Sequence, residues 1–144
     1  MNGLIPLQFE ETVRRALLED IGRGDLTTEA LIPPDLQAVA VMRAKAEGRV
    51  AGLPVAELAF RLVDSRVEVN LLAKEGAEVR PGAEVLRATG PAGSLLTAER
   101  VALNFVQRLS GIATATARAV AGTAGTRAVV VDTRKTTPGL RALV

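Results

Sequence analysis

The sequence contains no cysteine and no histidine among its 144 residues. The absence of cysteine excludes disulfide bonds, thiolate metal sites and cysteine nucleophiles within these residues. The absence of histidine leaves carboxylates, lysine, hydroxyls and backbone groups as the available acids, bases and metal ligands. Aromatic residues make up only 2% of the chain, with no Trp or Tyr. Because proteins that bind single-stranded nucleic acids stack the bases on aromatic side chains, the composition argues against such a partner.

The chain also lacks a large excess of positive or negative charge. The chain has 18 Lys and Arg against 16 Asp and Glu, so its net charge is +2, and no block of five like charges occurs. A small anionic ligand is therefore as good an interpretation of the slight basic excess as nucleic acid. The length fits one ordinary domain, or one small domain plus part of another, and a hydrophobic content of 48% is enough to bury a core.

The chain has no long hydrophobic run. No segment approaches the roughly 18 consecutive apolar residues of a membrane span. The N-terminus, MNGLIPLQFEETVRR, lacks the basic start followed by a long apolar run that marks a secretory signal. We expect a cytoplasmic protein that binds neither membranes nor nucleic acids.

The N-terminal part predicts a helix followed by a short turn. Apolar residues at three- and four-residue spacing predict a helix over about residues 8–20. The glycines of EDIGRGDLTT break this helix, and Thr27 or Thr28 is expected to cap the short turn that follows. Asp20 and Asp25 are interpreted as helix punctuation.

Between residues 38 and 90 the hydrophobic period changes to two, which is typical of half-buried strands. Strands are predicted at 39–45 and 66–73, on either side of a helix that Pro54 opens. Turn residues in KEGAEVRPGAEV separate further short strands. We infer a compact α+β unit with a small sheet that folds on itself.

A long helix is predicted from Thr97, as its N-cap, to a stop at Gly122. Arg100 then falls in the first turn, where a cation faces the positive end of the helix dipole and costs roughly 0.3 to 1 kcal/mol without compensation. Two explanations stay open: a solvated or Glu-paired arginine, or an anion site formed by Arg100 and the free helix N–H groups. The apolar stripe of this helix comprises Val101, Phe105, Leu109, Ile112 and Ala113.

The segment TRAVVVD, residues 126–132, predicts a strand that is covered on both faces, because its apolar run does not alternate. Polar residues at the carboxyl end of such a strand lie where α/β folds bind ligands. After it, Arg134 offers a planar fork to a carboxylate or phosphate, and Lys135 a point charge. The alternative is a solvated pair of cations, and the dipeptide alone does not decide between the two.

Three stretches, EDIGRGDLTT, AERVALNFVQRLSGIAT and DTRKTTPGLRAL, together resemble quinolinate phosphoribosyltransferase, also called nicotinate-nucleotide pyrophosphorylase (carboxylating). The resemblance runs in order over nearly the whole chain. It implies an enzyme of NAD biosynthesis that makes nicotinate mononucleotide, diphosphate and carbon dioxide from quinolinate and phosphoribosyl diphosphate with magnesium. It also implies an α+β N-terminal sandwich domain, hammerhead or barrel-sandwich-like, followed by an α/β barrel.

The resemblance implies substrate-binding roles for four residues. Arg100 would help to bind the quinolinate carboxylates in the active site of a neighbouring subunit, within a homodimer or a hexamer of dimers. Thr133, Arg134 and Lys135 would contact quinolinate and the phosphoribosyl donor at the end of the first barrel strand. Magnesium would accompany phosphoribosyl diphosphate with no ligand in this segment, and no catalytic residue is assigned.

One departure limits the resemblance. Family members continue with most of the barrel, including a His-Arg pair, a further Lys and acidic residues that serve the substrate and magnesium. We therefore expect residues 1–110 to form the sandwich domain and residues 111–144 the first helix and strand of a barrel that is cut short. Residues 1–144 alone are expected to be inactive.

Two other interpretations stay open. The first is a phosphoribosyltransferase of the same architecture with another substrate, such as nicotinate phosphoribosyltransferase or the molybdenum-associated relatives of the family. Protection from heating by quinolinate but not by nicotinate would distinguish the two substrates. The second is a non-catalytic binding or dimerisation module built on the sandwich domain.

Overall fold

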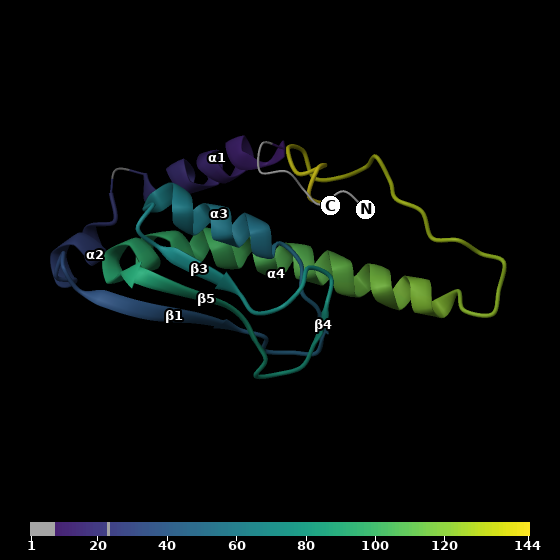
Figure 1. Cartoon of the computed structure of the whole chain (residues 1–144). Coiled ribbons are helices and arrows are strands. Elements are labelled where there is room, and N and C mark those ends of the chain that lie inside the picture. The colour runs from purple at the N-terminus through teal and green to yellow at the C-terminus, as the bar shows by residue number, and fades with distance from the viewer. Residues whose placement is uncertain (1–7, 23) are drawn as a thin grey trace.

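The computed structural model describes residues 8–22 and 24–144, so residues 1–7 of the N-terminus and residue 23 of the EDIGRGDLTT motif lie outside it. α3 and α4 form a layer between α1 on one side and the main sheet on the other (Figure 1). The elements of the described ranges are, in order, α1 (Glu10–Ile21), α2 (Leu26–Leu31), β1 (Gln37–Arg43), β2 (Gly48–Arg49), α3 (Leu53–Val63), β3 (Glu68–Leu71), β4 (Glu78–Val79), β5 (Glu84–Pro91) and α4 (Ala92–Gly122).

The main sheet has the strand order β1-β5-β3, and both pairings are antiparallel. Exposed and half-buried residues alternate along β1, because only one face of this edge strand is covered. The central strand β5 is mostly buried. β2 and β4 form a second, two-stranded antiparallel sheet. The predicted α+β unit with a small sheet, and the strands at its two-residue period, are confirmed.

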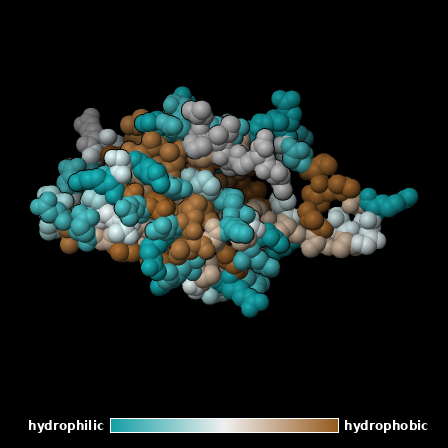
Figure 2. Space-filling view, in the orientation of Figure 1, coloured by the Kyte–Doolittle hydropathy of each residue, from teal (hydrophilic) through white to brown (hydrophobic). Residues whose placement is uncertain are grey.

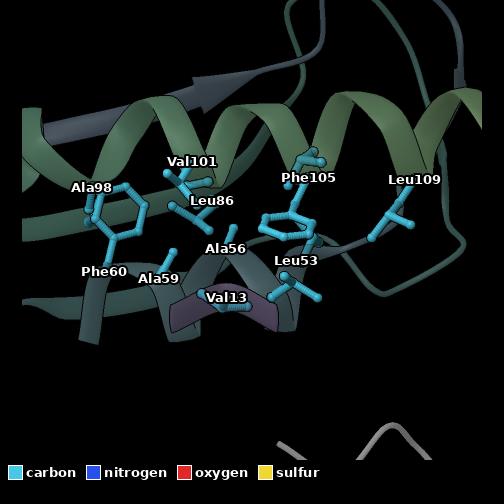
Figure 3. Packing of buried hydrophobic residues seen from close by; sticks show 14 of the residues in the cluster. Val13, Leu53, Ala56, Ala59, Phe60, Leu86, Ala98, Val101, Phe105 and Leu109 are labelled. Carbon is cyan, nitrogen blue, oxygen red and sulfur yellow. The ribbon is translucent and has the colours of Figure 1, made fainter. Parts of the chain in front are cut away.

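The core forms where α4 packs against α3 (Figure 3). Ala56 and Ala59 of α3 are fully buried, and such small side chains let two helices approach closely. Each fully buried Val, Leu or Phe contributes about 1.5 to 3 kcal/mol relative to an exposed one. The side chains that meet here are Leu53, Ala56, Ala59 and Phe60 of α3, Ala98, Val101, Phe105 and Leu109 of α4, Val13 of α1 and Leu86 of β5.

The 31-residue helix α4 ends at Gly122 as predicted, but it begins earlier than predicted. Its N-cap is Pro91, not Thr97, because β5 runs straight into the helix and the Ala92 N–H donates to the Leu36 carbonyl oxygen at 2.8 Å. The predicted apolar stripe is buried as far as Leu109, but Ile112 is 37% exposed. None of the helices in the described ranges, α4 included, combines the length and apolar character needed to cross a membrane.

The short helix α2 is capped by Asp25, not by Thr27 or Thr28. The Asp25 carboxylate accepts a hydrogen bond from the Thr28 N–H at 3.3 Å. The interpretation of Asp25 as helix punctuation is therefore confirmed, and Gly22, with φ at 55°, ends α1 as predicted.

The C-terminal loop, residues 123–144, contains no strand, so the strand predicted at 126–132 was wrong. Val129 and Val131 are 81% and 78% exposed, and hydrophobic surface marks this end of the molecule in Figure 2. A strand forms only by hydrogen bonding to a neighbouring strand. In the described ranges both sheets are built from strands that precede α4, so the apolar run of this segment has no pairing partner.

Candidate functional site

The C-terminal loop carries three of the predicted site residues and turns back towards the start of α1 (Figure 1). The Thr12 hydroxyl donates to the Gly139 carbonyl oxygen at 3.3 Å, and Arg108 of α4 donates to the Thr137 hydroxyl. The Leu140 N–H donates to the Thr137 carbonyl oxygen at 3.0 Å, which closes the turn predicted at 137–139. This turn therefore fixes the end of the loop against α1 and α4.

A hollow of about 490 Å³ lies between the loop and the second half of α4. Small-molecule sites commonly enclose about 300 to 1,000 Å³, so its size suits a compact ligand. The hollow combines apolar side chains with hydroxyls, one carboxylate and one ammonium group. Its lining residues are Ile112, Thr116 and Val120 of α4 and Val130, Val131, Asp132, Thr133, Lys135, Thr136, Thr137 and Val144 of the loop.

The structure brings Thr133 and Lys135 to this hollow but not Arg134. The Lys135 N–H donates to the Thr133 hydroxyl at 3.1 Å, which forms a local turn and places the two side chains on one side of the loop. Arg134 is exposed, and the part of the chain that the structure describes gives it no ion-pair partner. Within this chain, Lys135 therefore lines the hollow and the adjacent Arg134 does not.

Arg100, the fourth predicted site residue, lies in the third turn of α4, because the helix begins at Ala92. The prediction that it opposes the helix dipole was therefore wrong, since that effect fades within the first turn. Its Nε donates to Asp20 Oδ2 at 3.0 Å, and its Nη2 lies 3.7 Å from Asp25 Oδ2. Arg100 is thus paired with two aspartates and not, as one explanation had it, with a glutamate.

Asp25 is the more tightly held of these two acids. Its carboxylate also accepts a hydrogen bond from the Thr97 hydroxyl at 3.5 Å. Hydrogen bonds from the Thr28 hydroxyl and backbone N–H lower the pKa of Asp25 below its usual value, and the charge of Arg100 and the bond from Thr97 act in the same direction. Asp25 therefore stays ionised at neutral pH next to the guanidinium.

The structure does not bring Arg100 together with the loop residues. The nearest residue of α4 that lines the hollow is Ile112, which is twelve residues further along the helix. At 1.5 Å of rise per residue, the two positions are about 18 Å apart along the helix axis. One chain therefore presents two separate groups, the Arg100 cluster and the loop hollow.

Neither group gathers the three or more carboxylates of an all-protein metal site. The residues that the structure describes contain no cluster of three or more carboxylates placed to hold an ion. Asp132 alone lines the hollow, and the two acids at Arg100 are engaged by the guanidinium. These residues therefore do not form an all-protein cage of oxygen ligands.

Sequence reasoning missed Asp20, Asp25 and Arg108 as contributors to these groups. The two aspartates were assigned only to helix ends, and Arg108 was not given a partner. Two aspartates beside glycine breaks, ahead of a helix that carries an arginine, were the available signal for the pairing. The partner of Arg108, Thr137, lies in a loop whose path could not be predicted from local pattern.

Residues 25–110 match the sequence profile described as "Quinolinate phosphoribosyl transferase, N-terminal domain". Residues 112–144 match the profile described as "Quinolinate phosphoribosyl transferase, C-terminal domain". The first match covers more than half of the chain, and the second begins inside α4.

Curated relatives carry matching names. A "probable nicotinate-nucleotide pyrophosphorylase [carboxylating]" from Bacillus subtilis is 42% identical over 137 residues, which are 95% of this chain and 47% of that protein. One with the same name from Synechocystis is 50% identical over 129 residues, covering 88% of this chain and 43% of that protein. A chloroplastic nicotinate-nucleotide pyrophosphorylase from Oryza sativa is 45% identical over 134 residues, which are 92% of this chain and 36% of that protein. The chain spans less than half the length of these relatives.

Solved structures show the same fold. NadC from Streptococcus pyogenes superposes with a TM-score of 0.94 at 42% identity, over 99% of this chain and 51% of that one. The nicotinate-nucleotide pyrophosphorylase from Francisella tularensis superposes with a TM-score of 0.90 at 32% identity, over 98% of this chain and 50% of that one. The likeness therefore extends over the α+β unit, α4 and the C-terminal loop.

Proposed function

Because the chain belongs to the quinolinate phosphoribosyltransferase family, we propose that the protein transfers a phosphoribosyl group to quinolinate, giving nicotinate mononucleotide, diphosphate and carbon dioxide in NAD biosynthesis. The observation that carries the proposal is the match to both domain profiles in the family order, with one residue between them. The relatives named for this reaction, at 42 to 50% identity, support it.

We assign substrate binding to Arg100, Thr133, Arg134 and Lys135. Quinolinate carries two adjacent carboxylates and its co-substrate carries a diphosphate, so several fixed cations must gather before both bind together. Lys135 and Thr133 line a hollow of suitable size, and Arg134 is exposed for contact with a ligand outside it. These observations support the assignment of the loop.

The chemistry requires positioning more than covalent help from the protein. The ring nitrogen of quinolinate must be held in line with the anomeric carbon of ribose as diphosphate leaves. Decarboxylation follows because the pyridinium ring accepts the negative charge that develops on the adjacent carbon. Magnesium would accompany phosphoribosyl diphosphate, and we give no residue of this chain a role as its ligand.

We also propose that residues 1–110 act as the sandwich domain and that residues 111–144 belong to the barrel domain. The boundary between the two matched profiles supports this division, although α4 runs through it without a break. A cytoplasmic location stays a prediction, and the Oryza sativa relative is named chloroplastic.

The first test is the reaction itself. We expect the full-length protein to form nicotinate mononucleotide from quinolinate and phosphoribosyl diphosphate, and to release carbon dioxide in equal amount. Arg134→Ala should raise the KM for quinolinate by about 10-fold to 100-fold, because a charge-assisted hydrogen bond contributes about 1.5 to 3 kcal/mol. Arg127→Ala, which removes another exposed cation from the same loop, is the matched control and should leave this KM unchanged. Use of nicotinate in place of quinolinate would overturn the proposal.

We further propose a homodimer or a hexamer of dimers in which Arg100 serves the site of the neighbouring subunit. The separation of about 18 Å between Arg100 and the loop hollow along α4 supports a shared site. The Arg100→Ala and Arg134→Ala proteins, each impaired at low quinolinate concentration, should regain activity there when their subunits are mixed, because some sites then hold both arginines. No regained activity would argue against sharing.

A further inference from the structure

We propose that Asp20 and Asp25 are positioning residues that hold the Arg100 guanidinium with one edge free to bind a substrate carboxylate. The inference rests on the proposed function, because it takes Arg100 to be a substrate-binding residue. It concerns acids at the ends of α1 and α2 that sequence patterns assign only to helix punctuation.

The contacts of Arg100 use one edge of the guanidinium. Nε donates to both carboxylate oxygens of Asp20, at 3.3 and 3.0 Å. Nη2 lies 3.7 Å from Asp25 Oδ2, and within the described ranges Nη1 makes no hydrogen bond or ion pair. The side chain is 48% exposed. The edge formed by Nη1 and Nη2, which binds a carboxylate with two parallel hydrogen bonds, is therefore open.

The two carboxylates are themselves fixed. Asp25 caps α2 through the Thr28 N–H and accepts from Thr97, one turn before Arg100 on α4. Its side chain is only 11% exposed, and that of Asp20 is 26% exposed. Three elements therefore hold the guanidinium in place, which reduces the rotamer entropy that a free arginine would lose on binding a ligand.

The net charge of the cluster shows that it does not act by a general attraction of anions. One guanidinium and two carboxylates sum to −1, so the cluster is not a positive patch that draws in any anion. What the cluster offers a dianionic substrate is the direction of the open edge. In the shared site proposed above, cations from the C-terminal loop of the neighbouring subunit would meet the remaining charge. If the aspartates instead competed with the substrate for Arg100, removing one would tighten binding. The two roles predict opposite signs.

The experiment measures steady-state kinetics of the full-length protein with Asp20→Asn, which keeps the size of the side chain and removes its charge. We expect the KM for quinolinate to rise about 5-fold to 10-fold while kcat changes less than about 2-fold, since a ground-state binding contact is lost. The KM for phosphoribosyl diphosphate should not change. Asp20→Glu, which keeps the carboxylate, should restore most of the affinity.

Two controls separate this role from a structural one. Glu11→Gln removes another carboxylate of α1, paired with exposed Arg15, and should leave the kinetics unchanged. In an Arg100→Ala background, Asp20→Asn should have no further effect on the KM, because the two act through one contact. An unchanged or lower KM in Asp20→Asn, or additive effects of the two changes, overturns the positioning role alone. A wild-type protein that forms no nicotinate mononucleotide overturns the proposed function as well.

Discussion

Ser110 bonds both backbone groups of Ala51. The Ala51 N–H donates to Ser110 Oγ at 2.9 Å, and Ser110 Oγ donates to the Ala51 carbonyl oxygen at 3.2 Å. One turn later, Thr114 repeats the arrangement with Arg49, at 2.9 and 3.4 Å. Two hydroxyls of α4 thus take the place of a neighbouring strand along residues 49–51, whose backbone groups need partners. These bonds fix the second half of α4, and with it the start of the C-terminal loop, to the segment that joins β2 to α3.

We expect Ser110→Ala to lower the free energy of unfolding by about 1 to 2 kcal/mol, because the Ala51 N–H and carbonyl group lose their partner in a part-buried place. Thr116→Ala, which removes an exposed hydroxyl from the same helix, is the matched control for the higher helix propensity of alanine. Urea unfolding measures both. Equal stability of the two variants would contradict a structural role for Ser110.

Gly52→Ala should lower the free energy of unfolding by about 2 kcal/mol or more, because two costs combine. Gly52 has φ at 90°, which other residues adopt poorly, and it precedes α3. A Cβ built there would lie 2.7 Å from Leu109 Cδ1, a core side chain. Thermal unfolding followed by circular dichroism provides the measurement.

The control for this change is Gly111→Ala, on the exposed face of α4. A Cβ at Gly111 meets no atom within 4 Å. Since alanine is favoured over glycine inside a helix by roughly 1 kcal/mol, this variant should be more stable than wild type. If both variants changed stability in the same direction, the loss of a glycine would explain the effect of Gly52→Ala, and the contact with Leu109 would not.

Stability should fall in acid through Asp64. Its carboxylate accepts hydrogen bonds from the Arg66 side chain, from the Ser94 hydroxyl at 2.6 Å and from the Arg66 N–H, and these lower its pKa well below the usual 3.8. Because the pKa is lower in the folded state than in the unfolded state, this stabilisation is complete above the unfolded pKa. It is lost as the pH falls through the folded pKa.

The measurement is the free energy of unfolding in urea at a series of pH values from 7 downwards. Asp64→Asn should be less stable than wild type at pH 7, and the difference should shrink below about pH 4 as wild type loses its stabilisation. Ser94→Ala, which removes one of the bonds to Asp64, should give an intermediate curve. A constant difference across the series would rule out Asp64 as a source of the pH dependence.

Local patterns predicted the α+β unit and its three longer helices. The two-residue hydrophobic period predicted β1 and β3, and Pro54 marked the start of α3. Apolar residues at three- and four-residue spacing predicted α1 and the buried stripe of α4. The N-terminus of α4 was predicted wrongly because a threonine with cap chemistry lies inside the helix, where its hydroxyl bonds Asp25 instead. The position of this N-cap depends on where the preceding strand ends, and the tertiary structure sets the end of that strand.

The sequence by itself determined which family the motifs indicate and drew attention to three cations. Arg100 was singled out by its position, and Arg134 and Lys135 by their place after an apolar run. Only the tertiary structure decided that Arg100 pairs with Asp20, 80 residues earlier, and that residues 126–132 form no strand. The physical reason is that spacing along the chain records the local conformation of an element. Ion pairs and strand pairing instead depend on which distant segments the packing of α4 brings together.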